Sequence, residues 1–163
     1  NLENVLAAAA ISRHFEVDPL RIKEAIEDYM PTNNRSQFVK SERNQIIMDA
    51  YNANPTSMQA SLNNLFDMSH PRKVVILGDM LELGSYAGDE HQKIVDMVRD
   101  TSLYKVFLVG ELFSQSSYPD NFRVFRDTIS LNDYLKSNPL HECLILIKGS
   151  RGIGLERIAV TIS

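Results

Sequence analysis

The sequence predicts an α/β fold: a Rossmann-like three-layer domain with a mostly parallel sheet of about six strands, preceded by a short helical segment. Short apolar runs alternate with helical patterns over most of the chain, which is typical of parallel strands joined by helices. Several of these runs are apolar at every position, as in strands that helices cover on both faces. The first part of the chain differs, because it carries only helical spacing.

Two helices are predicted in that first part. Leu2 to Phe15 is rich in alanine, a strong helix former. Pro19 to Tyr29 follows Asp18, a good N-cap residue, and has proline at its first helical position. Pro31 to Asn34 is turn-forming, and strand-like runs begin after it. We therefore place a boundary near Asn33, between a helical unit at residues 1–33 and an α/β domain at residues 34–163.

A hairpin opens the α/β domain. Phe38 to Lys40 and Gln45 to Asp49 are strand-like runs on either side of the polar segment Ser41 to Asn44, so we expect them to pair. A helix follows from Pro55 to about Met68. Alternating strands and helices make up the rest of the domain. The expected strands are Lys73 to Leu77, Lys105 to Val109, Arg123 to Phe125 and Cys143 to Lys148, and the expected helices are Asp89 to Asp100, Ser130 to Ser137 and one from about Gly154.

Composition argues against several classes of function. The 163 residues have 44% apolar side chains and a net charge of -4, so the broad basic surface of a nucleic-acid-binding protein is missing. No apolar stretch approaches the roughly 20 residues that span a bilayer, and the start of the chain lacks a signal-peptide pattern. The single cysteine, Cys143, lies in an apolar run without a disulfide partner. We expect a cytoplasmic protein without nucleic-acid partners or membrane insertion.

Three loops rich in polar and glycine residues follow predicted strands. They are Asp49 to Pro55, Gly78 to Gly84 and Lys148 to Gly152. Ligands of parallel α/β sheets bind at the carboxyl ends of the strands. We therefore expect the three loops to open on one edge of the sheet and to form a site there.

The first of these loops carries side chains suited to a nucleoside. Asp49 can accept hydrogen bonds from hydroxyl groups, and Asn52 and Asn54 offer both donors and acceptors to a heterocycle or a ribose. A purely local alternative is that Asn54 caps the helix that begins at Pro55 and that Asn52 shapes the turn.

The other two loops also allow alternatives. Gly78-Asp79 suggests a metallophosphatase, but no Asn-His pair accompanies it, and Asp79 could instead bind backbone amides. His91 is close enough in sequence to join this cluster, or to serve in capping or packing. Lys148 to Gly154 combines cations, a hydroxyl and glycines, which suits a carboxylate or phosphate, although a solvated basic turn is the alternative. It is neither a dinucleotide fingerprint nor a P-loop.

Four motifs together resemble the third, carboxy-terminal domain of the Mur ligases. The motifs are Asn34 to Gln37, Ile47 to Met58, Ile76 to Gly84 with His91, and Lys148 to Arg151. Within the family they are most similar to the enzymes that add D-alanyl-D-alanine. The opening, Asn1 to Ala9, resembles the end of the family's central ATPase domain. The resemblance implies that the amino-terminal UDP-binding domain and the P-loop of the central domain lie upstream of residue 1.

The resemblance implies an ATP- and Mg²⁺-dependent ligase of peptidoglycan biosynthesis. ATP would phosphorylate the terminal carboxylate of UDP-N-acetylmuramoyl-tripeptide, and the amine of D-alanyl-D-alanine would attack the acyl phosphate. We expect this chain alone to hold no cofactor tightly, and neither to hydrolyse ATP nor to form the amide. The competing class is a non-catalytic nucleotide-binding or regulatory α/β module.

Site residues follow from the same resemblance. The group implied to bind ATP consists of Arg35, Asp49, Tyr51, Asn52 and Asn54. The group assigned to the carboxylate-bearing dipeptide consists of Lys148, Ser150 and Arg151. A third group matches the family pattern and could line the cleft: Asp79, Glu82 and His91. No residue is identified as a metal ligand or as a secure catalytic group.

Overall fold

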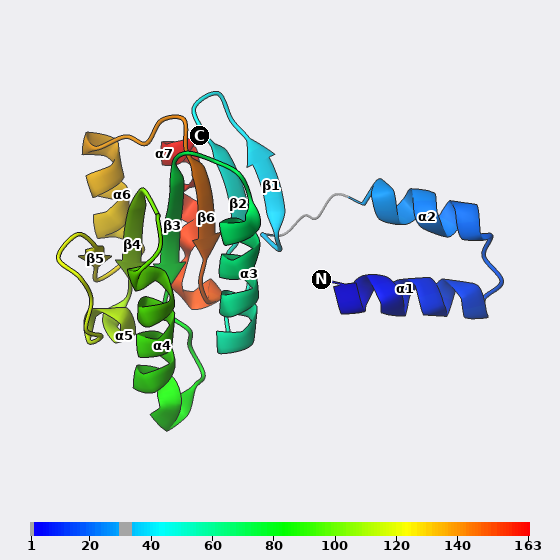
Figure 1. Cartoon of the computed structure of the whole chain (residues 1–163), viewed down its shortest axis with the longest axis horizontal. Helices are drawn as coiled ribbons and strands as arrows, with labels where there is room; N and C mark the ends of the chain where they lie inside the picture. The colour runs from blue at the N-terminus through cyan, green and yellow to red at the C-terminus, as the bar shows by residue number, and fades with distance from the viewer. Residues whose placement is uncertain (1, 30–33) are drawn as a thin grey trace. The chain divides into compact units, whose positions relative to one another are not determined.

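The computed structural model describes residues 2–29 and 34–163. Contacts divide the chain into two compact units, Asn1–Pro31 and Thr32–Ser163 (Figure 1). The first unit is a pair of helices, and the second contains a six-stranded sheet. The turn predicted from Pro31 and the boundary predicted near Asn33 lie outside the described residues.

The first unit consists of α1 (Leu2–His14) and α2 (Pro19–Glu27). Glu16, in the left-handed conformation with a φ of 58°, follows α1 and turns the chain. Asp18 caps α2, because its carboxylate accepts a hydrogen bond from the Leu20 amide at 2.8 Å. Both predicted helices are confirmed, with ends slightly earlier than expected.

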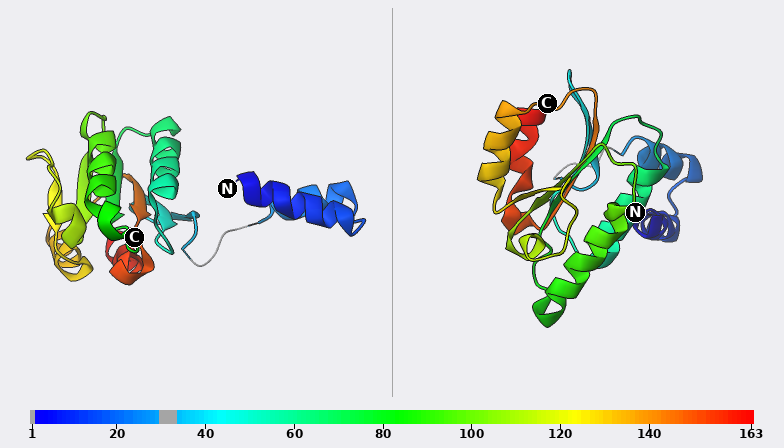
Figure 2. Two further views of the ribbon diagram at one scale, coloured as in Figure 1. Left: turned by 90° about the horizontal axis from the view of Figure 1, so that it is seen from below. Right: turned by 60° about the vertical axis from the view of Figure 1, so that its left-hand side comes forward.

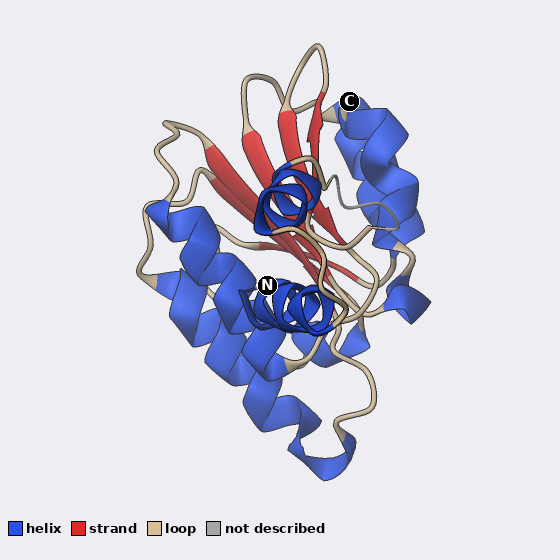
Figure 3. Ribbon diagram, turned by 90° about the vertical axis from the view of Figure 1, so that its right-hand side faces the viewer, coloured by secondary structure: helices blue, strands red, loops and turns tan. Residues whose placement is uncertain are grey.

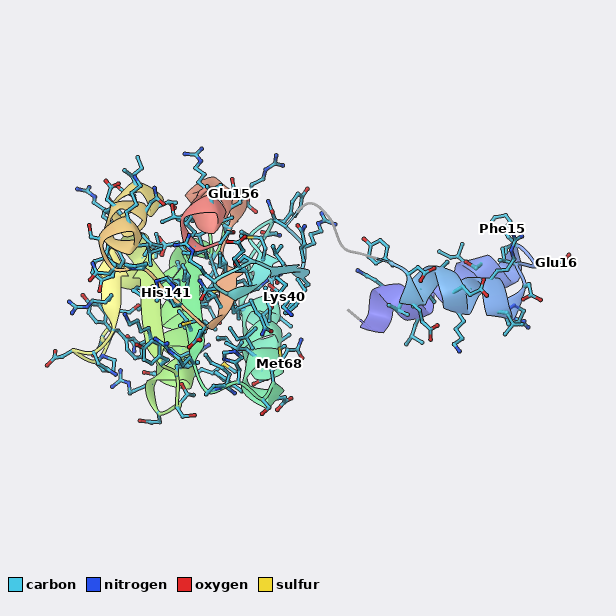
Figure 4. All side chains as sticks on the ribbon, turned by 90° about the horizontal axis from the view of Figure 1, so that it is seen from above. Phe15, Glu16, Lys40, Met68, His141 and Glu156 are labelled. Atoms are coloured by element: carbon cyan, nitrogen blue, oxygen red, sulfur yellow. The ribbon has the colours of Figure 1, made fainter. Side chains whose placement is uncertain are left out.

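The described side chains of the helical unit form no buried core. No side chain from residue 4 to residue 29 is fully buried, and Phe15 is 73% exposed. Figure 4 shows Phe15 and Glu16 at the end of the unit where the two helices join. Helices this short are marginal in water unless they pack against other structure. The other exposed apolar side chains of the unit are Val5, Leu6, Ile11, Val17, Leu20 and Tyr29.

The second unit is built on a sheet with the strand order β1-β2-β6-β3-β4-β5. β2, β6, β3, β4 and β5 are parallel, and β1 pairs antiparallel with β2 at one edge. The predicted fold class and the predicted hairpin are therefore confirmed. The strands are β1 (Gln37–Lys40), β2 (Gln45–Asp49), β3 (Lys73–Gly78), β4 (Lys105–Val109), β5 (Arg123–Phe125) and β6 (Leu144–Lys148).

Helices cover both faces of the sheet, which gives the unit three layers (Figures 2 and 3). α3 (Pro55–Asp67) and α4 (Ala87–Arg99) pack on one face. α6 (Thr128–Ser137) and α7 (Ala159–Ile162) pack on the other. The single turn α5 (Glu111–Ser114) follows β4. Among the helices of residues 2–29 and 34–163, none is long and apolar enough to cross a membrane.

Apolar side chains of the strands alternate between two cores, one on each face. On β6, Ile145 and Ile147 belong to the core with α6, whereas Leu144 and Leu146 belong to the core with α3 and α4. This two-sided burial explains why the run is apolar at every position. Cys143 lies in the core with α6, and burial raises the pKa of its thiol. It therefore serves as a small apolar side chain at neutral pH.

The predicted helix from Gly154 is wrong in form. Gly154 has a φ of 71°, and it separates two 3₁₀ turns, Arg151–Ile153 and Leu155–Ile158, so that only the short α7 follows. α6 begins earlier than predicted, because Asp127 accepts from the Ser130 amide at 2.8 Å and caps it. α5 had no predicted counterpart. The remaining predicted elements are confirmed within about two residues.

We predict that amide hydrogens of α1 and α2 exchange far faster than those of β3 and β6 in this chain. The helices lack buried side chains around their hydrogen bonds, whereas both strands lie in the centre of the sheet. Hydrogen–deuterium exchange followed by mass spectrometry measures both regions in one sample. Equal protection of α1 and β6 would contradict an unpacked helical unit.

Candidate functional site

The three predicted loops lie at one edge of the sheet. β6 pairs with both β2 and β3, and the register sets Lys148 beside Asp49 on one side and beside Leu77 on the other. These strands are parallel, so the loops that follow them leave the sheet together. The loops after β3 and β6 approach closely, since a Cβ added to Gly149 would lie 3.0 Å from the Gly78 Cα. Glycine permits this backbone approach.

Asp49 and Lys148 form a largely buried ion pair across β2 and β6. Lys148 Nζ lies 2.5 Å from Asp49 Oδ2, and the two side chains are 2% and 14% exposed. The same ammonium donates to the Asn52 carbonyl at 3.4 Å. Asp49 also accepts hydrogen bonds from the Ser61 hydroxyl and the Ser36 amide, both at 3.1 Å. One carboxylate therefore connects the segment before β1, helix α3 and strand β6.

Three exposed side chains gather near this pair. The Arg35 guanidinium carbon lies 3.9 Å from the centre of the Tyr51 ring, and that of Arg151 lies 5.6 Å from the same centre. Cations over an aromatic face form cation–π contacts. Within the described parts of the chain, neither guanidinium forms an ion pair. The cluster therefore offers two positive charges and a planar surface to a ligand.

The two predicted asparagines have different environments. Asn54 Oδ1 accepts from the Ser57 amide at 2.8 Å, and the Ser57 hydroxyl accepts from the Asn54 amide at 3.1 Å. This reciprocal pair is a capping box for α3, so the local alternative for Asn54 is confirmed. Asn52 gives its backbone carbonyl to Lys148, and its side chain is exposed.

Asp79, directly after β3, is a buried hydrogen-bond acceptor. Its carboxylate accepts hydrogen bonds from the Leu112 and Phe113 amides, both at 2.9 Å, and its side chain is 5% exposed. The amide-binding alternative for Asp79 is therefore confirmed. Gly110 leaves the space that the carboxylate occupies, because a Cβ added there would lie 2.2 Å from the Asp79 Cγ.

His91 is fully buried and packs edge-on against Phe113, with 4.6 Å between the ring centres. Its Nδ1 lies 2.6 Å from the Ala87 carbonyl oxygen, and its Nε2 lies 3.0 Å from the Met80 amide nitrogen. The first contact requires a hydrogen on Nδ1, and the second requires a lone pair on Nε2. With this tautomer, His91 links α4 to the loop after β3. It therefore supports the loop without facing solvent itself.

Ser150 joins the loops after β3 and β6. Its amide donates to the Asp79 carbonyl at 3.1 Å, and its hydroxyl accepts from the Leu81 amide at 2.9 Å. Ser150 itself is buried, whereas the neighbouring Arg151 is exposed. Glu82 is exposed in the same region and has a left-handed φ of 69°. Of the three residues predicted to line the cleft, Asp79 and His91 are buried and Glu82 is exposed to solvent.

Sequence reasoning missed Ser36, Ser61 and Gly110. Ser61 is seven residues after the N-cap Asn54, a spacing that places it on the cap's side of the helix and could have indicated contact with the strand end. Gly110 directly follows an apolar strand, which is the position where a ligand loop begins. Ser36 lies inside the first predicted motif, but only the fold reveals that its amide faces Asp49.

The fold and the site define a mostly parallel α/β domain whose polar loops meet at the carboxyl ends of its strands, where sheets of this class bind ligands. Residues 34–151 match the family described as Mur ligase, glutamate ligase domain. The chain therefore belongs to the Mur ligase family.

Curated relatives agree with this assignment. The chain is 32% identical over 137 residues to the UDP-N-acetylmuramoyl-tripeptide–D-alanyl-D-alanine ligase of Rickettsia prowazekii, with 82% of this chain and 30% of the relative covered. It is 30% identical over 167 residues to the ligase of the same name from Bacillus subtilis, with 97% of this chain and 36% of the relative covered. The chain thus spans 30% to 36% of the length of these relatives.

Solved structures have the same fold. MurF from Acinetobacter baumannii superimposes with a TM-score of 0.82 at 25% identity, over 96% of this chain and 36% of that chain. MurF ligase from Thermotoga maritima, determined in complex with ADP, superimposes with a TM-score of 0.79 at 20% identity, over 98% of this chain and 37% of that chain. The Thermotoga likeness shows the fold alone.

We predict that Gly110→Ala destabilises the α/β unit by about 2 to 3 kcal/mol. The new Cβ would collide with the Asp79 carboxylate, and the φ of 127° is unfavourable for alanine. Gly88→Ala is the matched control, because nothing lies within 4 Å of its added Cβ and the position is helical. Urea unfolding measures both variants. Equal stability of the two would contradict the buried role of Asp79.

Proposed function

We propose that this chain is the carboxy-terminal domain of an ATP-dependent ligase that joins D-alanyl-D-alanine to UDP-N-acetylmuramoyl-tripeptide in peptidoglycan biosynthesis. Membership of the Mur ligase family and the names of the curated relatives support the proposal. The observation that carries it is the convergence of Arg35 and Arg151 on the Tyr51 ring, in the loop that follows the Asp49–Lys148 pair. A cytoplasmic location remains a prediction.

The nucleotide would bind on the side of Arg35, Asp49 and Tyr51. An exposed guanidinium can offset phosphate charge, and an aromatic ring provides a surface for stacking. Asp49 already accepts three hydrogen bonds, and a carboxylate has about four acceptor positions, so one stays open to a ribose hydroxyl. The Asn52 side chain is exposed beside them, and Asn54 would contribute by shaping the loop.

The dipeptide would bind on the side of Ser150 and Arg151. Arg151 is exposed, and a guanidinium can hold a carboxylate through two parallel hydrogen bonds. The Ser150 hydroxyl accepts from Leu81, so its own hydrogen can still be donated to a ligand. Arg151 lies next to the Arg35 and Tyr51 cluster, which would bring the amine of the dipeptide near the phosphate end of the nucleotide.

Upstream domains would supply the rest of the site. Within the described residues, no group of three or more His, Cys, Asp or Glu side chains is arranged to hold a metal ion. We propose that the upstream domains hold Mg²⁺ and most of the triphosphate. We propose that residues 1–33 belong to the central ATPase domain. The exposed apolar side chains of α1 and α2 would then pack against that domain.

The proposed chemistry requires water to be kept out. The γ-phosphoryl group of ATP would pass to the terminal carboxylate of the tripeptide, and the dipeptide amine would then displace phosphate from the acyl phosphate. An acyl phosphate hydrolyses if water reaches it before the amine does. Closure of this domain over the upstream site would place the amine and exclude solvent, which accelerates amide formation by holding the reactants together.

We predict that Arg35→Met, in the full-length protein that contains this segment, raises the KM for ATP about tenfold. It should leave the KM for the UDP-linked tripeptide unchanged. Arg35 is exposed, so its loss removes a charge without disturbing the core. Asp49→Ala is a less direct test, because it would leave the buried Lys148 unpaired. Steady-state phosphate release at varied ATP measures the effect.

Arg123→Met is the matched control. Arg123 is exposed at the amino end of β5, the outermost strand of the sheet. The candidate site lies instead at the carboxyl ends of β2, β3 and β6. Its substitution should leave every KM unchanged. If Arg35→Met behaved like this control, Arg35 would have no role at the nucleotide and the proposed orientation of the site would be wrong.

A further inference from the structure

Lys148 is a charged side chain with almost no exposed surface. Its side chain is 2% exposed, and its ammonium contacts the Asp49 carboxylate at 2.5 Å and the Asn52 carbonyl at 3.4 Å. Both contacts lie on the nucleotide side of the proposed site. The neighbouring Arg151 is exposed and has no such partner among the described residues.

We propose that Lys148 is a positioning residue of the nucleotide site and not a ligand of the dipeptide carboxylate. This inference rests on the proposed function and assigns Lys148 to a different half of the same site. Arg151 then remains as the exposed cation on the dipeptide side of the loop.

Burial of the ion pair separates Lys148 from the dipeptide. Because the Lys148 side chain is only 2% exposed, its ammonium would have to move outward and away from Asp49 to meet a substrate carboxylate, and the Asp49 carboxylate would then lose its counter-ion. Removing one partner of a buried pair is strongly unfavourable. Arg151 offers a cation at the surface without this cost.

The pair sets the position of groups that reach the ligand. Besides its contact with Lys148, the Asp49 carboxylate accepts hydrogen bonds from the Ser61 hydroxyl and the Ser36 amide. Ser36 follows Arg35 directly and has a left-handed φ of 48°, so its hydrogen bond to Asp49 orients the segment that carries the Arg35 guanidinium. Lys148 therefore acts on the nucleotide through Asp49 and Arg35.

Kinetics of three variants of the full-length protein test the inference. Lys148→Met keeps the length of the side chain without its charge, Asp49→Asn removes the other charge, and the double variant removes both. Lys148→Met should raise the KM for ATP about tenfold or more and leave the KM for D-alanyl-D-alanine within about twofold. The double variant should bind ATP no worse than Asp49→Asn alone, because Lys148 acts through Asp49.

Controls separate this role from a loss of folding. Lys136→Met removes an exposed lysine of α6 and should change neither KM. Thermal unfolding shows whether each variant is folded at the assay temperature. If Lys148→Met does not fold, the double variant decides, because it leaves neither charge of the pair buried without its partner. If the KM for D-alanyl-D-alanine rose in the double variant but not in Asp49→Asn, the inference would be overturned.

The outcomes distinguish the inference from the proposed function. If Arg35→Met raises the KM for ATP but Lys148→Met raises only the KM for D-alanyl-D-alanine, the proposed function stands and Lys148 is a dipeptide ligand. If neither Arg35→Met nor Asp49→Asn changes the KM for ATP, the nucleotide role of this edge is wrong and the inference is wrong with it. A rise in the KM for ATP alone in Lys148→Met supports both.

Discussion

A buried ion pair between two neighbouring parallel strands organises the ligand edge of this domain. Lys148 at the end of β6 and Asp49 at the end of β2 lie opposite each other in the sheet register, so their side chains meet where the strands end. Burying both charges is costly unless each is paired and hydrogen-bonded. The Ser36 amide, the Ser61 hydroxyl and the Asn52 carbonyl supply the remaining contacts.

A second buried network supports the other half of the edge. Asp79 binds amides of α5 through its carboxylate and the Ser150 amide through its carbonyl, and His91 fastens the loop after β3 to α4. Together the two networks connect the loops after β2, β3 and β6 to the sheet and its helices. Arg35 and Arg151 stay exposed, so the connected loops present charged groups that remain available to ligands.

Local patterns predicted the strands, the parallel sheet and the shared edge, because apolar runs and strand-end polar residues are visible in the chain itself. The partners of the polar groups could not be predicted in the same way. Asp49 and Lys148 are 99 residues apart, and only the insertion of β6 between β2 and β3 brings them together. The same long-range pairing is the basis of our proposal that Lys148 is a positioning residue, where the sequence suggested a ligand of the dipeptide.

The most direct test is a crystal structure of the full-length protein with a non-hydrolysable ATP analogue and D-alanyl-D-alanine. We expect a ribose hydroxyl to donate to Asp49 while Lys148 stays paired with the same carboxylate, and the dipeptide carboxylate to contact Arg151. A nucleotide bound away from Asp49 and Arg35 would contradict the account, as would Lys148 turned from Asp49 to the dipeptide.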